Sequence, residues 1–274
     1  MSGKNCITLT IVGLQKDAGD VEFKSFLNQL NLVRKALNET ERITFQGDEK
    51  KNIAYFKVSN LSHESPAKII LEAVPYSIDT ISSTKKLVDK FFLSLDEIDS
   101  GKMPGGFDYV ALDAFKGMSK LIENKKIERL HISRNGGKKT QLNEFHAKID
   151  LILGPDVSEF GSAKGRMEYL NLHGRANLFY IYPSHNLPKI KCLFRKKIRH
   201  DVINSIDKFV TVYGKKKFKP NITSYNPYEI VVDMIEIHPN IDQLPMLEDL
   251  IGISPNATGD KTSEDFVRGI RDEW

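Results

Sequence analysis

Aromatic and basic side chains gather between residues 164 and 220, in a pattern that could bind a polyanion. Tyr180 and Tyr182 lie two apart in a β-branched run, so in a strand both would point to one side, opposite Phe179. The basic residues of the stretch are Lys189, Lys191, Arg195, Lys196, Lys197, Lys215, Lys216 and Lys217. Rings beside a lysine-rich groove bind single-stranded nucleic acid through stacking and phosphate contacts. The alternative is structural: the rings fill a core and the lysines are merely solvated.

The charges of the chain are segregated along its length. Residues 164–220 carry 14 basic and 3 acidic side chains, whereas residues 221–274 carry 3 basic and 11 acidic ones. Residues 1–163 are almost balanced, at 23 to 22, and the net charge is +4. Because a basic surface attracts polyanions and an acidic one repels them, this segregation predicts either two different partners or one partner and an internal acidic mask.

A short amphipathic helix is predicted near residue 270. Thr262 to Asp265 supplies a hydroxyl cap and first-turn acids, as helix starts do. The apolar residues that follow form one stripe: Phe266, Val267, Ile270 and Trp274. The stripe either docks on this chain or lies in a partner's groove. We favour the partner, because a link rich in Pro and Asn precedes the helix and the chain's one tryptophan suits an interface anchor. Arg268 and Arg271 either form surface ion pairs or insert a guanidinium into an acidic pocket.

The common signatures of catalysis are absent. The sequence has no phosphate-binding loop, no dinucleotide-binding glycine motif, no HExxH and no GxSxG, so we expect no enzyme and no cofactor. His146 and Asp150 could share a helix face, but we expect no metal there. Cys6 and Cys192 are the only cysteines and should be reduced, buried thiols. An enzyme of a type without a short motif stays open as a third possibility.

Residues 1–155 are predicted to form an α+β domain, with helices on one face of an antiparallel sheet. Strands are expected at 7–12, 52–60, 67–73 and 127–133 from their β-branched or alternating residues. Apolar residues spaced three and four apart predict helices from Asp20, over 88–98 and over 111–122. Asn135-Gly136-Gly137 predicts a hairpin turn.

Residues 160–239 predict a small five-stranded, OB-like β-barrel. Strand-like runs stand at 166–173, 178–182, 190–194, 209–214 and 228–237, with one helix at 199–206 between the third and the fourth. This is the order of the OB-fold, which commonly binds single-stranded nucleic acid. Residues 240–274 are then an acidic linker and a C-terminal helical tail that cannot build a core of their own.

The overall composition is that of a folded protein. Of the 274 residues, 40% are hydrophobic and 28% charged, which excludes collagenous and largely disordered chains. No apolar run approaches the ~18–20 residues needed to cross a membrane, and the start lacks the order of a signal peptide. We therefore expect a cytoplasmic protein without a membrane partner. The sequence leaves its oligomeric state open.

Four runs of sequence carry a resemblance: residues 17–30, 61–75, Gly165 to Gly174, and Thr258 to Trp274. They resemble a family of poorly characterised bacterial proteins encoded beside PIN-domain ribonuclease toxins. The resemblance implies an antitoxin-like role, in which a C-terminal helix crosses the metal-holding carboxylates of the nuclease and inserts a basic residue. Arg268 and Arg271 are the matching positions. The long α+β segment departs from this pattern, since small antitoxins lack it.

Two functions from different classes follow. The one we favour is a non-enzymatic, antitoxin-like protein whose C-terminal helix binds and neutralises a PIN-domain ribonuclease, while its basic barrel binds DNA or RNA. The alternative is a stand-alone single-stranded nucleic-acid-binding protein whose acidic tail masks its own binding surface. The first requires a protein partner, and the second requires none.

Overall fold

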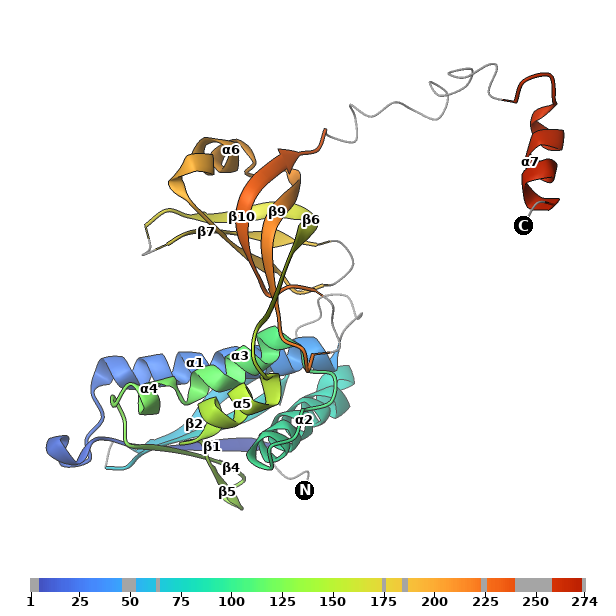
Figure 1. The fold of residues 1–274 in the computed structure, drawn as a ribbon. Coiled ribbons are helices and arrows are strands. Elements are labelled where there is room, and N and C mark those ends of the chain that lie inside the picture. The colour runs from blue at the N-terminus through green and yellow to red at the C-terminus, as the bar shows by residue number, and fades with distance from the viewer. Residues whose placement is uncertain are drawn as a thin grey trace.

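The computed structural model describes residues 5–45, 53–62, 65–173, 176–183, 187–222, 226–239 and 258–272. Within these ranges the chain is an α+β protein with two five-stranded sheets, and a C-terminal helix lies apart from both (Figure 1). The predicted fold class is therefore confirmed at this level. In the described part of the chain, no helix combines the length and apolar character that crossing a membrane requires.

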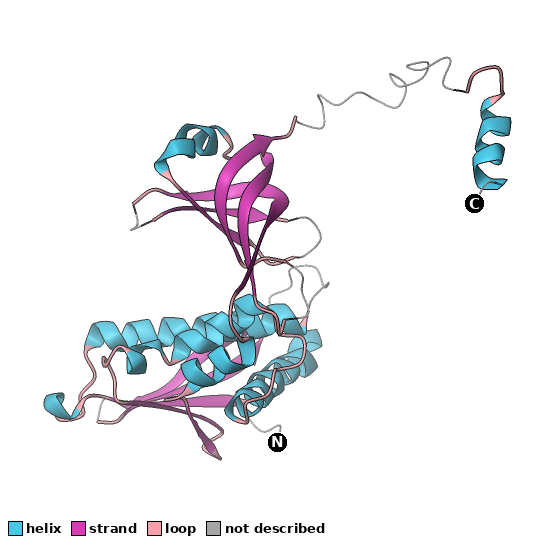
Figure 2. Cartoon of the chain, viewed as in Figure 1, coloured by secondary structure: helices cyan, strands magenta, loops and turns pink. Residues whose placement is uncertain are grey.

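The first sheet is antiparallel throughout, in the order β2-β3-β1-β4-β5. Its strands are β1 (Cys6–Val12), β2 (Ala54–Ser62), β3 (Ala67–Pro75), β4 (Arg129–Arg134) and β5 (Lys139–Gln141). The helices cover one face of it (Figure 2). Side chains of β1 alternate, because Ile7, Leu9 and Ile11 are fully buried in the core while Thr8 and Thr10 point to the opposite face.

Five α-helices and two 3₁₀ turns complete this part: η1 (Gln15–Asp17), α1 (Phe23–Thr44), η2 (Ile78–Thr80), α2 (Ile81–Asp99), α3 (Tyr109–Met118), α4 (Lys120–Glu123) and α5 (Phe145–Leu153). The expected helices are present, and α5 was not predicted. The expected cap Asp20 is wrong, since α1 begins at Phe23. Asp20 instead lies in the turn after β1, where its carbonyl oxygen approaches Gly13. A Cβ on residue 13 would lie 1.9 Å from that oxygen, so the turn requires glycine at this position.

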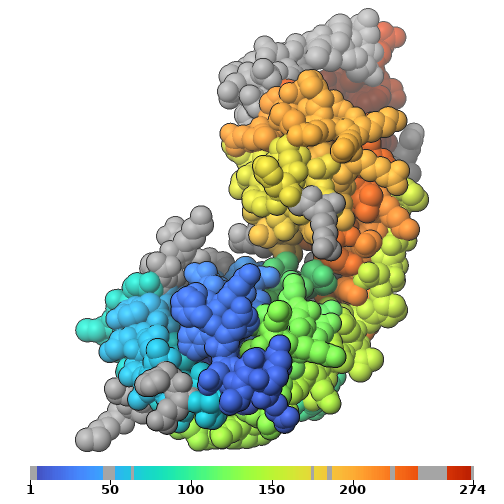
Figure 3. All heavy atoms as spheres, turned by 90° about the vertical axis from the view of Figure 1, so that its left-hand side faces the viewer, coloured from blue at the N-terminus to red at the C-terminus, as the bar shows by residue number. Residues whose placement is uncertain are grey.

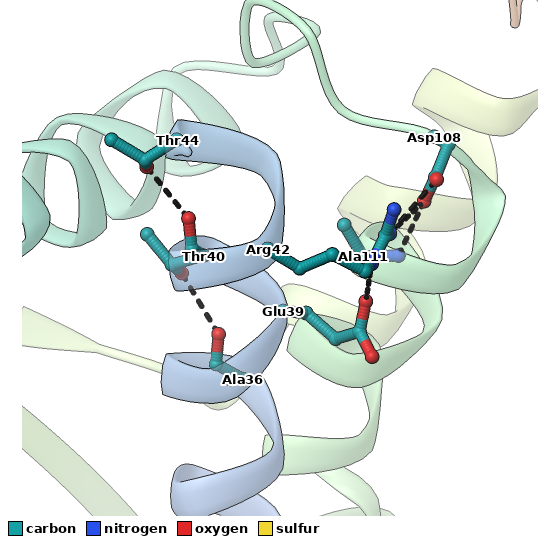
Figure 4. A network of polar contacts seen from close by, with 7 residues as sticks. All are labelled: Ala36, Glu39, Thr40, Arg42, Thr44, Asp108 and Ala111. Carbon is teal, nitrogen blue, oxygen red and sulfur yellow. Dashed lines mark hydrogen bonds and ion pairs between the residues drawn. The ribbon is translucent and has the colours of Figure 1, made fainter. Parts of the chain in front are cut away.

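Helices α1 and α3 are joined by a charged network (Figure 4). Arg42 Nη2 donates to both carboxylate oxygens of Asp108 at 2.8 Å, and its Nε donates to Glu39 at 2.6 Å. Asp108 also caps α3 by accepting from the backbone N–H of Ala111 at 2.9 Å. One carboxylate thus satisfies a helix N-terminus and an arginine of the neighbouring helix, which fixes α3 against α1.

The second sheet closes on itself, because each strand is hydrogen bonded to two others in the order β10-β8-β7-β6-β9. Its strands are β6 (Val157–Asn171), β7 (Asn177–Tyr182), β8 (Ile190–Phe194), β9 (Phe209–Phe218) and β10 (Glu229–Ile237). Only β8 and β10 run parallel. The turn η3 (Lys196–Ile198) and helix α6 (Arg199–Asn204) lie between β8 and β9, so all five expected strands and the expected helix are present. We call this unit the closed sheet.

The two sheets have separate hydrophobic cores. The closed sheet is filled by Met167, Phe179, Ile181 and Val212 among others, and α6 adds Val202. The closed sheet contacts the helices of the first sheet at a joint where Tyr109 of α3 stacks on Tyr228, with ring centroids 4.1 Å apart. The loop between β9 and β10 thereby reaches the helices of the first sheet.

Further polar contacts hold the same joint. Asn221 Nδ2 donates to the Ile152 carbonyl at 2.8 Å, and Lys219 pairs with Asp156 at 2.6 Å. Asp156 also accepts from the Tyr228 hydroxyl, and burial together with this hydrogen bond raises the pKa of Tyr228. Specific contacts at one end of the closed sheet, where β6 begins and β9 ends, therefore connect it to the helices of the first sheet.

Candidate nucleic-acid interface

An aromatic row crosses the outer surface of the closed sheet. In β7, Phe179 and Ile181 are fully buried, whereas Tyr180 and Tyr182 point outward, as strand alternation predicts. Tyr180 lies opposite Tyr169 of β6, with ring centroids 5.3 Å apart. Lys189 Nζ lies 4.6 Å from the centroid of the Tyr180 ring. This arrangement offers a flat aromatic surface with a cation beside it, as base stacking next to a phosphate requires.

Tyr169 was not predicted as part of this surface. Met167 is buried, so strict alternation would turn Tyr169 inward as well. A β-bulge between Met167 and Tyr169 changes the register, and Tyr169 is 45% exposed as a result. The sequence contains no Gly or Pro at this point that would have marked the bulge.

An ionic cluster of Lys191, Glu229 and Lys217 lies next to the aromatic row on the neighbouring strands. Lys191 of β8 is opposite Tyr180 on one side and Glu229 of β10 on the other, and Glu229 is opposite Lys217 of β9. Glu229 is 7% exposed, and its carboxylate accepts from Lys191 at 2.9 Å and from Lys217 at 2.7 Å. Two of the lysines expected to bind nucleic acid are therefore engaged with a carboxylate from the acid-rich end of the sequence.

This cluster predicts acid sensitivity. Burial by itself raises the pKa of Glu229, but hydrogen bonds from Lys217 and Lys191 outweigh it, so the pKa lies below its usual value. The stability that the ionised carboxylate contributes is complete above the ordinary carboxyl pKa and is lost as the pH falls through the lower folded value. We expect Glu229→Gln to cost about 1–3 kcal/mol in the free energy of unfolding at neutral pH, because the lysines are partly solvated.

Urea unfolding at pH 7 and at about pH 3 measures this effect. The difference between wild type and Glu229→Gln should shrink in acid, because the unfolded chain takes up a proton at this carboxyl at a higher pH than the folded protein does. Glu168→Gln removes an exposed carboxylate from β6 and serves as the control. A penalty for Glu229→Gln that is unchanged between the two pH values would contradict the assignment.

The other predicted basic residues differ in their surroundings. Arg195, Lys196 and Lys197 are exposed around η3, and Lys215 is exposed on β9. Lys216 instead pairs with Glu159 at 2.8 Å. Among the residues that the structure describes, Lys189 and the three at η3 form no ion pair with a carboxylate. The basic residues thus do not form one continuous groove, and those nearest the aromatic row are Lys189 and Lys191.

A groove of ≈ 350 Å³ connects the aromatic row to the first part of the molecule. Tyr180, Lys189 and Lys191 line one wall, and Tyr109 and Lys35 of the helices line the other. Figure 3 shows the molecule hollowed between these two parts. The acidic side chains in the lining, which are Glu39, Asp113 and Glu229, all have cationic partners. Its one unpaired cation among the described residues, Lys189, is therefore free to contact a phosphate.

The C-terminal helix α7 (Ser263–Asp272) buries none of its side chains. Thr262 Oγ1 caps it by accepting from the backbone N–H of Asp265 at 3.2 Å, as predicted. Phe266, Val267 and Ile270 are 38%, 47% and 48% exposed. Trp274 and the linker 240–257 lie outside the described residues.

The two arginines of α7 differ in position. Successive helical residues are turned by about 100°, which places Arg271 about 90° and Arg268 about 150° from the middle of the apolar stripe. Arg268 lies 3.7 Å from Glu264, whereas Arg271 forms no ion pair within the described part of α7. Arg271 is therefore the better placed of the two to enter a partner together with the apolar side chains.

No metal centre is evident in the described ranges, where no three His, Cys, Asp or Glu side chains come together. Asp150, which shares α5 with His146, accepts from Lys116 at 2.6 Å. Burial strongly raises the pKa of the Cys192 thiol, which is inside the closed sheet. Comparison with protein-family models, with curated proteins and with solved structures finds no match for this chain.

Proposed function

We propose that this chain is a cytoplasmic, antitoxin-like protein that neutralises a PIN-domain ribonuclease through α7. The observation that carries the proposal is the exposure of the described apolar side chains of α7: Phe266, Val267 and Ile270 have no core to pack in. A ten-residue helix is marginal when it stands alone in water. Packing in a partner's groove would supply the missing stabilisation, as in other helix-in-groove complexes.

The charges beside the stripe indicate the chemistry of the partner. Arg271 is unpaired within the described part of α7 and flanks the apolar side chains. A guanidinium binds carboxylates through a planar fork of donors, and a buried pair of this kind needs an acidic pocket. The metal-holding carboxylates of a PIN-domain nuclease are such a pocket, and the family resemblance names this partner. Occupying that pocket with a cation would keep the catalytic metal out.

We further propose that the closed sheet is an OB-like barrel that binds single-stranded nucleic acid. Its strand pairs and the position of α6 follow the OB order, in which the second and third strands carry the ligand. These strands are β7 and β8, which present Tyr180 and Lys191. An antitoxin with such a surface could hold its nuclease on nucleic acid while inhibiting it.

Size-exclusion chromatography with the candidate nuclease tests the main proposal. The full chain should co-elute with the nuclease, and a chain without residues 258–274 should not. Activity of the nuclease on RNA should be suppressed by the full chain only. Co-elution that survives the truncation would refute the role of α7.

The aromatic row supports a second candidate, in which the protein binds single-stranded nucleic acid without any toxin. Here the acid-rich end would act as a mask on the basic surface. Oligonucleotide affinity should then fall steeply with salt, and removing residues 239–274 should tighten binding at every salt concentration. The absence of oligonucleotide binding at low salt would exclude this function.

A further inference from the structure

The face of the first sheet opposite its helices is hollowed and polar. Strand register places two rows of side chains there: Ile70, Thr8, Ser133 and Lys139 in one, and Lys68, Thr10, His131 and Gln141 in the other. The hollow has a volume of ≈ 480 Å³, which is within the range of small-molecule sites. Among the residues that the structure describes, its lining contains two lysines and several hydroxyls but no carboxylate. None of the functions above uses this face.

The hydroxyl groups are held in place but are not used by the protein. Thr8 and Ser133 are only 5% and 3% exposed. They are paired with each other across β1 and β4, so the register of the two strands holds them side by side. In the described part of the chain, neither hydroxyl forms a hydrogen bond with the protein, and both line the hollow. A ligand with strong acceptor oxygens would satisfy both donors at little cost in side-chain entropy.

The positive charge of the hollow is uncompensated. Within the described residues neither Lys68 nor Lys139 has an ion pair, and the carboxylate on the same face, Glu72, lies 4.0 Å from Lys57. Burial first, and then Lys139 and Arg129, lower the pKa of His131. The His131 Nδ1 atom is buried without a hydrogen-bond partner. Lysines and hydroxyls around a cavity whose described lining holds no acid are a typical setting for an oxyanion, and His131 lies beside it on the same face of the sheet.

We propose that this hollow is a binding site for a phosphate group, with Lys68 and Lys139 as its cations and Thr8 and Ser133 as its hydroxyl donors. Its size accepts a mononucleotide. The phosphate group belongs either to a free nucleotide or to a nucleic-acid strand. The site is independent of α7 and of the closed sheet, so it stands whether or not the antitoxin-like function holds. It would give the α+β segment a ligand of its own.

Calorimetric titration of the full-length protein tests the site at low ionic strength, with adenosine monophosphate and inorganic phosphate as ligands. The double variant Lys68→Gln/Lys139→Gln should weaken both affinities by roughly tenfold or more. Lys57→Gln removes one positive charge from the same sheet outside the hollow and should leave them unchanged. Thr8→Val should weaken binding, whereas Thr140→Val, on the core side of β5, should not.

Two further measurements complete the test. Bound phosphate should raise the pKa of His131, followed by NMR, in wild type but not in the double variant. If a nucleic-acid strand is the source of the phosphate, the double variant loses affinity for both oligonucleotides and inorganic phosphate. If a free nucleotide is the source, the double variant loses affinity for inorganic phosphate and keeps its affinity for oligonucleotides. Absence of binding by wild type, or equal binding by the double variant and Lys57→Gln, overturns the proposal.

Discussion

Arg271→Ala should weaken inhibition of a PIN-domain ribonuclease by roughly a hundredfold, because losing one member of a buried charge pair at an interface costs about 2–5 kcal/mol. Arg271 flanks the apolar stripe and forms no ion pair in the described part of α7, so its guanidinium can enter the partner with Phe266 and Ile270. The measurement is a titration of nuclease activity on a fluorescent RNA substrate. Truncation before α7 should abolish inhibition altogether.

Arg268→Ala is the matched control for this prediction. It removes the same side chain from the same helix, but Arg268 lies away from the stripe and beside Glu264. We expect a change of less than about threefold, which is the usual value of an exposed ion pair. Arg271→Lys should show an intermediate loss, because it keeps the charge and loses the planar fork. Equal losses for Arg268→Ala and Arg271→Ala would rule out the proposed orientation of the helix.

Tyr180→Ala should lower the affinity for single-stranded oligonucleotides by about 5- to 100-fold, which corresponds to the loss of one stacked base. Tyr180 is central to the row, since it contacts the Tyr169 ring on one side and Lys189 on the other. Fluorescence anisotropy with a short labelled oligonucleotide measures this affinity. Lys189→Gln should weaken binding less and reduce its salt dependence by about one phosphate contact.

Tyr213→Ala provides the control within the same sheet. Tyr213 is on β9 and donates its hydroxyl hydrogen bond to Glu236 at 2.8 Å, on strands that do not pair with β7. Its loss removes a ring of equal size and should leave oligonucleotide affinity within about twofold. If Tyr213→Ala weakens binding as much as Tyr180→Ala does, the aromatic row has no special role.

Much of the fold could be predicted from local patterns. The alternation of β7 predicts that Phe179 and Tyr180 lie on opposite faces, because successive side chains in a strand must do so, and the structure puts Phe179 inside. The helical spacing of Phe266 and Ile270 likewise predicts α7 and its stripe. These features depend only on residues within a few positions of one another, so they can be inferred from consecutive residues of the sequence.

The surroundings of the basic residues could not be predicted in this way. The segregation of charge along the chain suggests a uniformly basic barrel, but β10 brings Glu229 between Lys191 and Lys217. Glu159 pairs with Lys216 in the same manner. Strand pairing therefore neutralises part of the basic stretch with carboxylates that lie outside it in the sequence.

The sequence by itself determined the class of most elements, which side chains of a strand share a face, and the apolar stripe of α7, because backbone periodicity sets these locally. Only the tertiary structure decided that a bulge turns Tyr169 outward, and that Thr8, Lys68 and Lys139 share one hollow. Register between strands is set by packing and pairing over long distances, and a shift of one residue moves a side chain to the other face. The candidate sites depend on that register.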